Sequence, residues 1–384
     1  MTGRDGNASP ILELREVSAL APRRRGGRLR GVDLTVGRGR CLALLGERGG
    51  EGSFLLDLVA GYEPVSAGAI AVNGLAVSTL PPGRRGMAMV SGRDPLFPHL
   101  SVRDNLRLPL RIRGAGPAER DRRVDEAMAL LGLDGVAALK PRALDPADAV
   151  RARLARALVF DPQVLLMDDP FAGLDAPVRE ILRRTVRRLV AARGLCVLHA
   201  TVDRDEALLL GDAVGVLHDG ALQQSGPATE LLDRPASAVV ARVLGDANLL
   251  PGQVLRGDAE VVTVRLACGG EMEAEPAARL ENGETCVLSV RPDRIATAFL
   301  SRRSPARGGQ GRPDENGPEA GSLPAVLGEA VQMGDHVRLR FRLADGSEVL
   351  VRRPPAAQMG EMRPDRPAML AWQPHQARAF PLTT

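Results

Sequence analysis

The chain has 384 residues, of which 44% are hydrophobic, and it carries a formal net charge of +4. This length and composition allow a large buried core, predict two or three globular domains and exclude a disordered or fibrous chain. No apolar run approaches the roughly 18 residues of a membrane-spanning helix, and the first ten residues lack the apolar core of a signal peptide, so a cytoplasmic protein is expected.

Short apolar segments that end in small or acidic residues recur along the first 235 residues, and helical patterns lie between them. The strand-like segments are "CLALLG", "MAMVSG", "VLLMDDP", "LCVLHAT" and "AVGVLHDG". The helical patterns include "ERDRRVDEAMALLGL" and "APVREILRRTVRRLVAARG". Such alternation is typical of a parallel sheet covered by helices. We therefore expect an α/β domain over residues 1–235.

Beyond this point the pattern changes to short alternating strands separated by turn residues, as in "EVVTVRLACGG" and "HVRLRFRLADGSEVLVRR". These strands predict a small all-β domain over residues 236–384. Within it, residues 302–322 are rich in Gly, Pro and charge and have no apolar anchor. This segment is predicted to be a disordered loop.

The stretch from Cys41 to Gly61 has the strand, glycine-rich loop and helix order of a phosphate-binding P-loop, whose pattern is G-x-x-x-x-G-K-[ST]. The lysine position holds Gly52, and the glycine before it is replaced by Glu51. The loop residues that remain for a nucleotide and Mg²⁺ are Gly46, Gly49, Gly50 and Ser53. The loop therefore has the framework of a phosphate site without its lysine.

Two interpretations of Glu51 are compatible with each other. A carboxylate about 4 Å from a phosphate charge would repel it by roughly 4 kcal/mol at an effective dielectric of 20, which Arg48 could offset in part. An acid is also favourable at a helix N-terminus, where it would fill the anion site that a phosphate would otherwise occupy.

Five blocks in one order carry a resemblance to a known family. They are the "LLG" loop, "DPLFPHLSVRDNLRLPLRI", "RARLARALVFDPQVLLMDDPFAGLDAPVRE", "DRDEALLLGDAVGVLHDGALQQSG" and the tail strands "LPGQV", "LSVRPDRI" and "VQMGDHVRLRFRLADGSEVLVRR". The chain resembles the ATP-binding subunits of ABC importers, and its tail resembles the C-terminal regulatory β domain of the spermidine/putrescine type. The resemblance implies an α/β P-loop NTPase domain of the ABC ATPase type, with a helical subdomain at about 95–155, followed by an OB-like all-β domain. It also implies ATP and Mg²⁺ bound between two subunits.

The resemblance assigns roles to two consecutive acids and to one loop residue. Asp168 corresponds to the acid that holds Mg²⁺ through water, together with Ser53. Asp169 stands where the family has a glutamate general base, and Asp175 belongs to the dimer-contact loop. Because aspartate is one methylene shorter, and a displacement of about 1 Å can cost roughly a hundredfold in rate, Asp169 is expected to be a weakened base.

Other positions depart from the family pattern. Ala21 stands where an aromatic residue stacks on adenine, a contact worth about 1 to 3 kcal/mol by analogy with aromatic stacking on bases. Gly92 replaces the glutamine that contacts Mg²⁺ and the attacking water. Val202 replaces the switch histidine and can neither donate nor accept a proton. His199, three residues earlier, is interpreted as a core histidine.

The family signature L-S-G-G-Q aligns with "LDPAD", Leu144 to Asp148. Here Asp145 puts an anion in place of the serine hydroxyl, Pro146 has no N–H to donate, and Ala147 narrows the approach to the γ-phosphate. The same residues make a good helix start, with Asp145 as N-cap and Pro146 at the first helical position.

These departures predict an importer subunit with poor or absent ATP binding and hydrolysis. The expected partners are inner-membrane permease subunits, contacted on their cytoplasmic side, and a second copy or another ABC ATPase subunit. Leu96, Phe97 and Leu100 are either docking anchors or core residues. The alternatives are a working ATPase that energises uptake of polyamines or a similar solute and a non-catalytic regulatory or binding protein. A nucleic-acid partner is not expected, because the tail has few aromatic residues to stack on bases.

Overall fold

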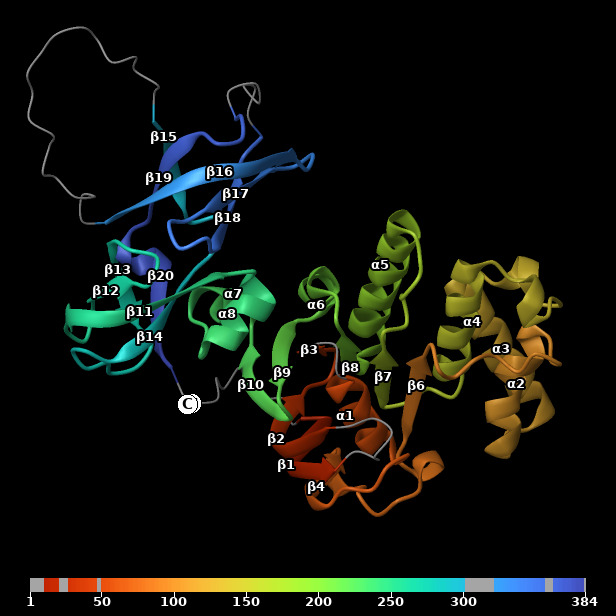
Figure 1. The fold of residues 1–384 in the computed structure, drawn as a ribbon. Helices are drawn as coiled ribbons and strands as arrows, with labels where there is room; N and C mark the ends of the chain where they lie inside the picture. Colours follow the sequence, from red (N-terminus) through yellow and green to blue (C-terminus); the bar gives the residue numbers. More distant parts are fainter. Residues whose placement is uncertain (1–9, 21–26, 47–49, 301–320, 356–361, 383–384) are drawn as a thin grey trace, which may run out of the picture. The chain divides into compact units, whose positions relative to one another are not determined.

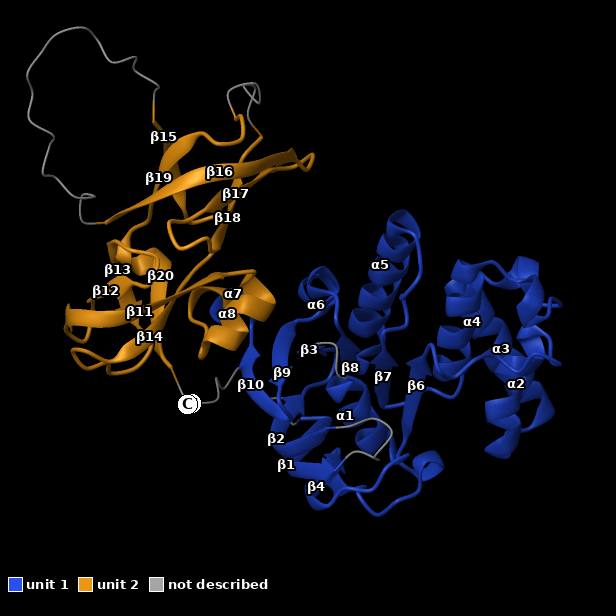
Figure 2. Ribbon diagram, in the orientation of Figure 1, with its two compact units in different colours: residues 1–231 blue, residues 232–384 orange. Residues whose placement is uncertain are grey.

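A computed structural model describes residues 10–20, 27–46, 50–300, 321–355 and 362–382. The chain divides into two compact units, residues 1–231 and 232–384 (Figure 2). The first is an α/β unit and the second is built mainly of β-strands, which confirms the expected fold class. Ala21 and residues 302–320 lie outside the described residues, and Ser322 begins a strand.

The centre of the first unit is a six-stranded sheet in the order β10-β9-β3-β8-β7-β6. Neighbouring strands are parallel except for the antiparallel pair of β9 and β10. The strands are β3 (Cys41–Gly46), β6 (Met87–Ser91), β7 (Val164–Asp168), β8 (Cys196–Thr201), β9 (Ala213–His218) and β10 (Ala221–Gly226). The parallel register places Ser91, Asp168 and Ala200 side by side at the carboxyl edge.

Both faces of this sheet are covered, which explains its continuous apolar strands. Along β7, Leu165 and Met167 belong to one core and Val164 and Leu166 to another. The first core includes α2 (Val102–Ile112), α3 (Pro117–Leu131), α4 (Pro146–Leu158) and α5 (Ala176–Arg193). The second includes α1 (Glu51–Ala60) and the smaller sheet β2-β1-β4-β5. Its strands are β1 (Leu12–Leu20), β2 (Arg28–Val36), β4 (Ala67–Val72) and β5 (Leu75–Ala76).

Two short helices follow strands of the main sheet (Figure 1). The short helix α6 (Arg204–Leu210) follows β8, and α7 (Ala228–Asp233) follows β10. Three 3₁₀ turns are η1 (Pro82–Arg84), η2 (Asp134–Val136) and η3 (Pro141–Ala143). No helix in the described ranges is long and apolar enough to cross a membrane.

The second unit begins with α8 (Ala238–Gly245) and contains a closed barrel and a five-stranded sheet. The barrel order is β11-β12-β13-β20-β14, made of β11 (Asn248–Gly257), β12 (Val262–Leu266), β13 (Glu271–Pro276), β14 (Thr285–Val290) and β20 (Ala377–Pro381). The sheet order is β15-β19-β16-β17-β18, made of β15 (Ala296–Phe299), β16 (Ser322–Gln332), β17 (Val337–Arg342), β18 (Glu348–Arg353) and β19 (Pro367–Ala371). Alternate strand residues form one shared core.

Candidate functional site: the carboxyl edge of the parallel sheet

The loop between β3 and α1 keeps the framework of a P-loop in its described part. β3 ends at Gly46, and α1 follows Gly50, whose φ of 75° lies in the left-handed region that glycine adopts without strain. Ser53, in the first turn of α1, donates a hydrogen bond from Oγ to Oδ1 of Asp168 over 2.5 Å. Arg48 and Gly49 lie outside the described residues. The two side chains that were predicted to hold Mg²⁺ are thus brought together.

Gly52, at the lysine position, lies where α1 packs against β8. A Cβ placed on Gly52 would be 3.0 Å from the Cβ of Ala200, closer than the roughly 3.5 to 4.0 Å of favourable carbon contacts. The glycine therefore allows the helix to approach the strand, and any larger residue requires one of them to shift. Sequence reasoning identified the missing lysine but gave no signal of this packing, because Ala200 is distant in the chain.

Glu51 begins α1, and its carboxylate contacts a distant turn. Its Oε1 accepts a hydrogen bond from the backbone N–H of Gly220, in the turn between β9 and β10, over 2.9 Å. The N-cap of α1 is Gly50, and it makes no side-chain capping bond. The expected acid at the helix N-terminus is confirmed, because Glu51 is the first residue of α1. One of its carboxylate oxygens is held by a turn from another part of the sheet, which the sequence did not predict.

Asp168 is the centre of a compact ionic cluster. Both Asp168 and Asp57, on α1, are buried. Arg93 contacts Oδ2 of Asp168 through Nη2 at 2.6 Å and Nε at 3.1 Å, and contacts the two oxygens of Asp57 at 3.2 and 3.3 Å. The Ser91 hydroxyl donates to the same Oδ2 over 3.2 Å. Each oxygen of Asp168 therefore has a partner within the chain.

Arg93 is the site residue that sequence reasoning missed. Gly92, at the glutamine position, is exposed, and a Cβ there would meet no atom within 4 Å. Arg93, the next residue, contacts Asp168 instead. The only signal in the sequence is an arginine directly after the glutamine position, and the choice of its acidic partners depends on how α1 and β7 are packed.

The three apolar residues that were predicted as docking anchors or core residues lie on the loop after Arg93 and differ in burial. Leu96 is buried in the core shared with α2–α5, whereas Phe97 is 42% exposed and Leu100 is half-buried. Asn105, fully buried on α2, fixes the loop by accepting a hydrogen bond from the Phe97 N–H over 2.8 Å and donating one to the Ser101 carbonyl over 2.9 Å. Leu96 is thus a core residue, and Phe97 and Leu100 remain available to a partner.

The residues at the signature position form a regular helix start. Asp145 is the N-cap of α4, with Oδ1 accepting from the Asp148 N–H over 2.7 Å, and Pro146 is the first helical residue. Asp145 and Pro146 are exposed, and Ala147 is half-buried. The helix-start interpretation of "LDPAD" is confirmed, and the carboxylate is engaged by its own helix.

Asp169 lies beside a buried acid and a buried histidine. Its φ of 44° is unusual for a residue with a side chain, and its N–H donates to the Ala200 carbonyl over 3.0 Å. Burial, followed by the charge of Glu206, raises the pKa of the Asp169 carboxyl above its usual range, and His199 opposes this shift. His199 is fully buried, 2.6 Å from Glu206 through Nε2, whereas Val202 is exposed. His199 is therefore a core histidine, as interpreted from the sequence.

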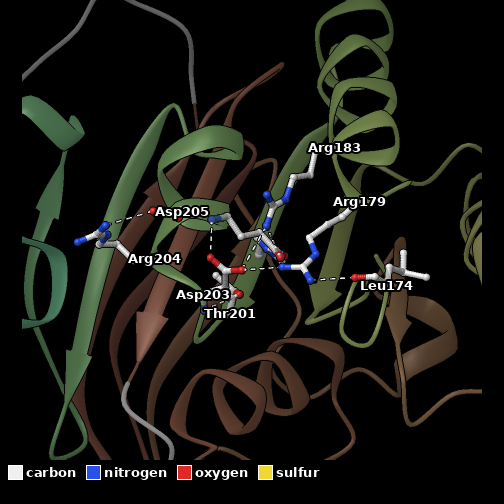
Figure 3. A network of polar contacts seen from close by, with 9 residues as sticks. Leu174, Arg179, Arg183, Thr201, Asp203, Arg204 and Asp205 are labelled. Carbon is white, nitrogen blue, oxygen red and sulfur yellow. Dashed lines mark hydrogen bonds and ion pairs between the residues drawn. The ribbon is translucent and has the colours of Figure 1, made fainter. Parts of the chain in front are cut away.

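A polar network joins the start of α5 to the loop after β8 (Figure 3). Arg179 donates to the Leu174 carbonyl over 2.9 Å and to Asp203 over 3.1 Å. Arg183 contacts Asp203 at 3.4 Å and Glu206 at 3.1 Å. Asp175, of the predicted dimer-contact loop, is the exposed N-cap of α5 and makes no side-chain capping bond. Arg179 and Arg183 therefore fix the conformation of the loop after β8, in which Val202 stands at the position of the switch histidine.

Known proteins match both parts of the chain. The family model for ABC transporters matches residues 29–172, and the TOBE domain model matches residues 288–380. The spermidine/putrescine import ATP-binding protein PotA 1 of Pseudomonas aeruginosa is 32% identical over 330 residues, which are 85% of each chain.

Relatives named for other solutes are also similar. The sn-glycerol-3-phosphate import ATP-binding protein UgpC of Chromohalobacter salexigens is 36% identical over 280 residues, 72% of this chain and 74% of the relative. The sulfate/thiosulfate import ATP-binding protein CysA of Mycobacterium tuberculosis is 39% identical over 264 residues, 69% of this chain and 74% of the relative. The two family matches and the similarity to these import subunits over most of the chain show that this chain belongs to the family of ABC importer ATP-binding subunits.

Proposed function

We propose that this protein is an ABC importer ATP-binding-subunit homologue of the polyamine type whose ATP binding and hydrolysis are poor or absent. It docks on inner-membrane permease subunits at their cytoplasmic face and pairs with itself or with another ABC ATPase subunit. The similarity to PotA 1 over 85% of both chains supports the polyamine type. The dimer-contact loop at Asp175 is retained and exposed, which supports pairing.

The observation that carries the loss of ATP chemistry is the packing of Gly52 on Ala200. As a glycine, residue 52 has no side chain that could neutralise the β and γ phosphates. A Cβ placed on it would lie 3.0 Å from the Cβ of Ala200, so there is also little room for such a side chain. A single charge pair about 4 Å apart at an effective dielectric of 20 is worth roughly 4 kcal/mol, or about three orders of magnitude in affinity. We infer that the loss of this lysine alone removes most of the nucleotide affinity.

The residues present also do not fit the Mg²⁺ that the family implies. The Asp168 oxygens already accept from Ser53, Ser91 and Arg93, and the last of these is a cation. A divalent ion at this carboxylate would have to replace a neutral hydroxyl bond and stand next to a guanidinium of like charge. No catalytic step through Mg²⁺ is therefore assigned to this chain.

The permease-docking part of the proposal is supported by the surface around α2 and α3. A hollow of about 370 Å³ lies there, lined by Leu100, Asp104, Arg107, Leu108, Arg111, Pro117, Arg120 and Asp121. Phe97 lies on the loop just before α2, is 42% exposed, and has its backbone fixed by Asn105. A partly exposed aromatic ring and a hollow lined by both apolar and charged side chains suit a short amphipathic helix of a permease.

Charge substitutions separate docking from folding. Phe97→Asp is expected to fold as wild type, because the side chain is exposed, and to lose capture of co-expressed polyamine-type permease subunits by a tag on this chain. Leu96→Asp is expected to unfold, because an unpaired charge in the core costs at least about 3 kcal/mol. Circular dichroism and the amount of permease captured from detergent-solubilised membranes measure the two effects.

Leu75→Asp is the matched control, since Leu75 is 73% exposed on β5 and outside the hollow. It should fold and still capture the permease. Capture by Phe97→Asp at the level of this control would show that docking takes place elsewhere, and unfolding of Phe97→Asp would withdraw the anchor role from this residue.

A further inference from the structure

We propose that Arg93 is a built-in cation that takes the place of the divalent metal ion in this site. The inference rests on the proposed function, because a guanidinium can hold this position only if the metal is not needed there. It goes further by assigning the charge of the missing ion to one side chain. It also predicts that Mg²⁺ does not change the thermal stability of the wild-type protein, and that substitution of Arg93 makes this stability depend on Mg²⁺.

The first support is the geometry of the contacts. The guanidinium lies between two carboxylates that are 5% and 6% exposed, Asp57 on α1 and Asp168 on β7. It binds Asp168 through Nε and Nη2 and Asp57 through Nη1 and Nη2, at distances from 2.6 to 3.3 Å. The planar fork of arginine suits such simultaneous binding of carboxylates, and a buried acid pair without a cation between them would be strongly unfavourable.

The second support is that the backbone is arranged to present Arg93. Its own N–H donates to the Ser91 Oγ over 3.0 Å, while that hydroxyl donates to Asp168. Arg153, on α4, holds the same turn by donating from Nη1 to the Ser91 carbonyl over 2.9 Å. Gly92, between Ser91 and Arg93 in the chain, has no side chain that could compete with Arg93 for the space beside Asp168. The arginine is therefore held from β6, β7, α1 and α4.

The third support is charge exclusion. The Arg93 side chain is 44% exposed, so solvent screens its charge in part, but at a few ångströms from Asp168 the guanidinium still repels a divalent cation. Removal of the guanidinium would leave Ser53, Ser91 and two buried carboxylates, which are oxygen ligands of the kind that Mg²⁺ prefers. The same substitution should therefore destabilise the fold and create sensitivity to Mg²⁺.

The test is thermal unfolding of the full chain with and without MgCl₂ at constant ionic strength. Wild type is expected to show no shift in Tm with Mg²⁺. Arg93→Ser should unfold roughly 5 °C or more below wild type, and MgCl₂ should recover part of this loss. Arg93→Lys, which keeps the charge and loses the fork, should fall between them and respond little to Mg²⁺. Arg103→Ser is the matched control, because Arg103 pairs with exposed Asp125 outside the site.

An equal effect of MgCl₂ on wild type and Arg93→Ser would overturn the assignment, as would a Tm of Arg93→Ser no lower than that of Arg103→Ser. If Arg93→Ser does not fold, Arg93→Ser/Asp57→Asn/Asp168→Asn should fold and ignore Mg²⁺, since both buried carboxylate charges are removed with the arginine that contacts them. Failure of that recovery would also overturn it. ATP hydrolysis by wild type would count against the proposed function, whereas absent hydrolysis with an equal Mg²⁺ effect would count against the Arg93 assignment alone.

Discussion

Wild-type protein and the Asp169→Asn variant are expected to hydrolyse Mg·ATP at rates within about twofold of each other, whereas loss of a working general base costs roughly 10²- to 10⁴-fold. The physical reason is that the charge-stabilising contacts fail before the base is needed. Position 52 has no lysine, position 202 has no histidine, and Asp145 at the signature caps its own helix. Phosphoryl transfer depends almost entirely on such positioning and charge stabilisation.

The measurement is phosphate release under saturating Mg·ATP, with both proteins purified in parallel. An ABC importer ATP-binding subunit with established ATPase activity, assayed beside them, shows that the conditions support turnover. A clear fall in rate from wild type to Asp169→Asn would mean that this carboxylate acts as a base, and the proposal of lost hydrolysis would have to be withdrawn.

Nucleotide binding should be recoverable by rebuilding the loop. Glu51→Gly with Gly52→Lys restores the P-loop pattern, but the lysine Cβ would crowd Ala200, whose Cβ would be 3.0 Å away. We therefore expect the triple variant that adds Ala200→Gly to bind ATP roughly a thousandfold tighter than wild type, in line with the value of one close charge pair. The double variant should bind more weakly than the triple variant.

Calorimetric titration of the three proteins with ATP measures this, and Ala200→Gly alone is the control for changes in packing. Hydrolysis should stay absent in the triple variant, because Gly92, Val202 and "LDPAD" are unchanged. No binding by a folded triple variant would show that this loop is not a phosphate cradle and that the alignment of Ser53 with the P-loop hydroxyl is wrong.

Local patterns predicted the framework of the site well. The apolar strands that end at Ser91, Asp168 and Thr201 are neighbouring parallel strands, and the strand that ends at Gly46 pairs with the last of these, so their carboxyl ends meet at one edge. The helix start at Asp145 and Pro146 was also predictable, because N-cap chemistry depends on residues three positions apart. These features are set by short-range sequence.

The features that escaped prediction depend on contacts between distant segments. Glu51 begins its helix as predicted, but the backbone donor at Gly220, 169 positions away, that binds its carboxylate could not be predicted. Arg93 finds Asp57 and Asp168 only after α1 and β7 have packed, and Gly52 matters because of Ala200 on β8. No periodicity or motif in the sequence records such pairings, so the sequence showed which family residues are replaced but not which residues contact each other at this edge.

Titration of the wild-type protein with Mg·ATP at low ionic strength tests the central claim most directly, because low salt favours any remaining attraction for phosphate. We predict no saturable heat of binding, with the rebuilt triple variant giving a clear isotherm under the same conditions. A saturable isotherm for wild type with an affinity close to that of the triple variant would contradict the claim that this ATP-binding subunit has lost its nucleotide site.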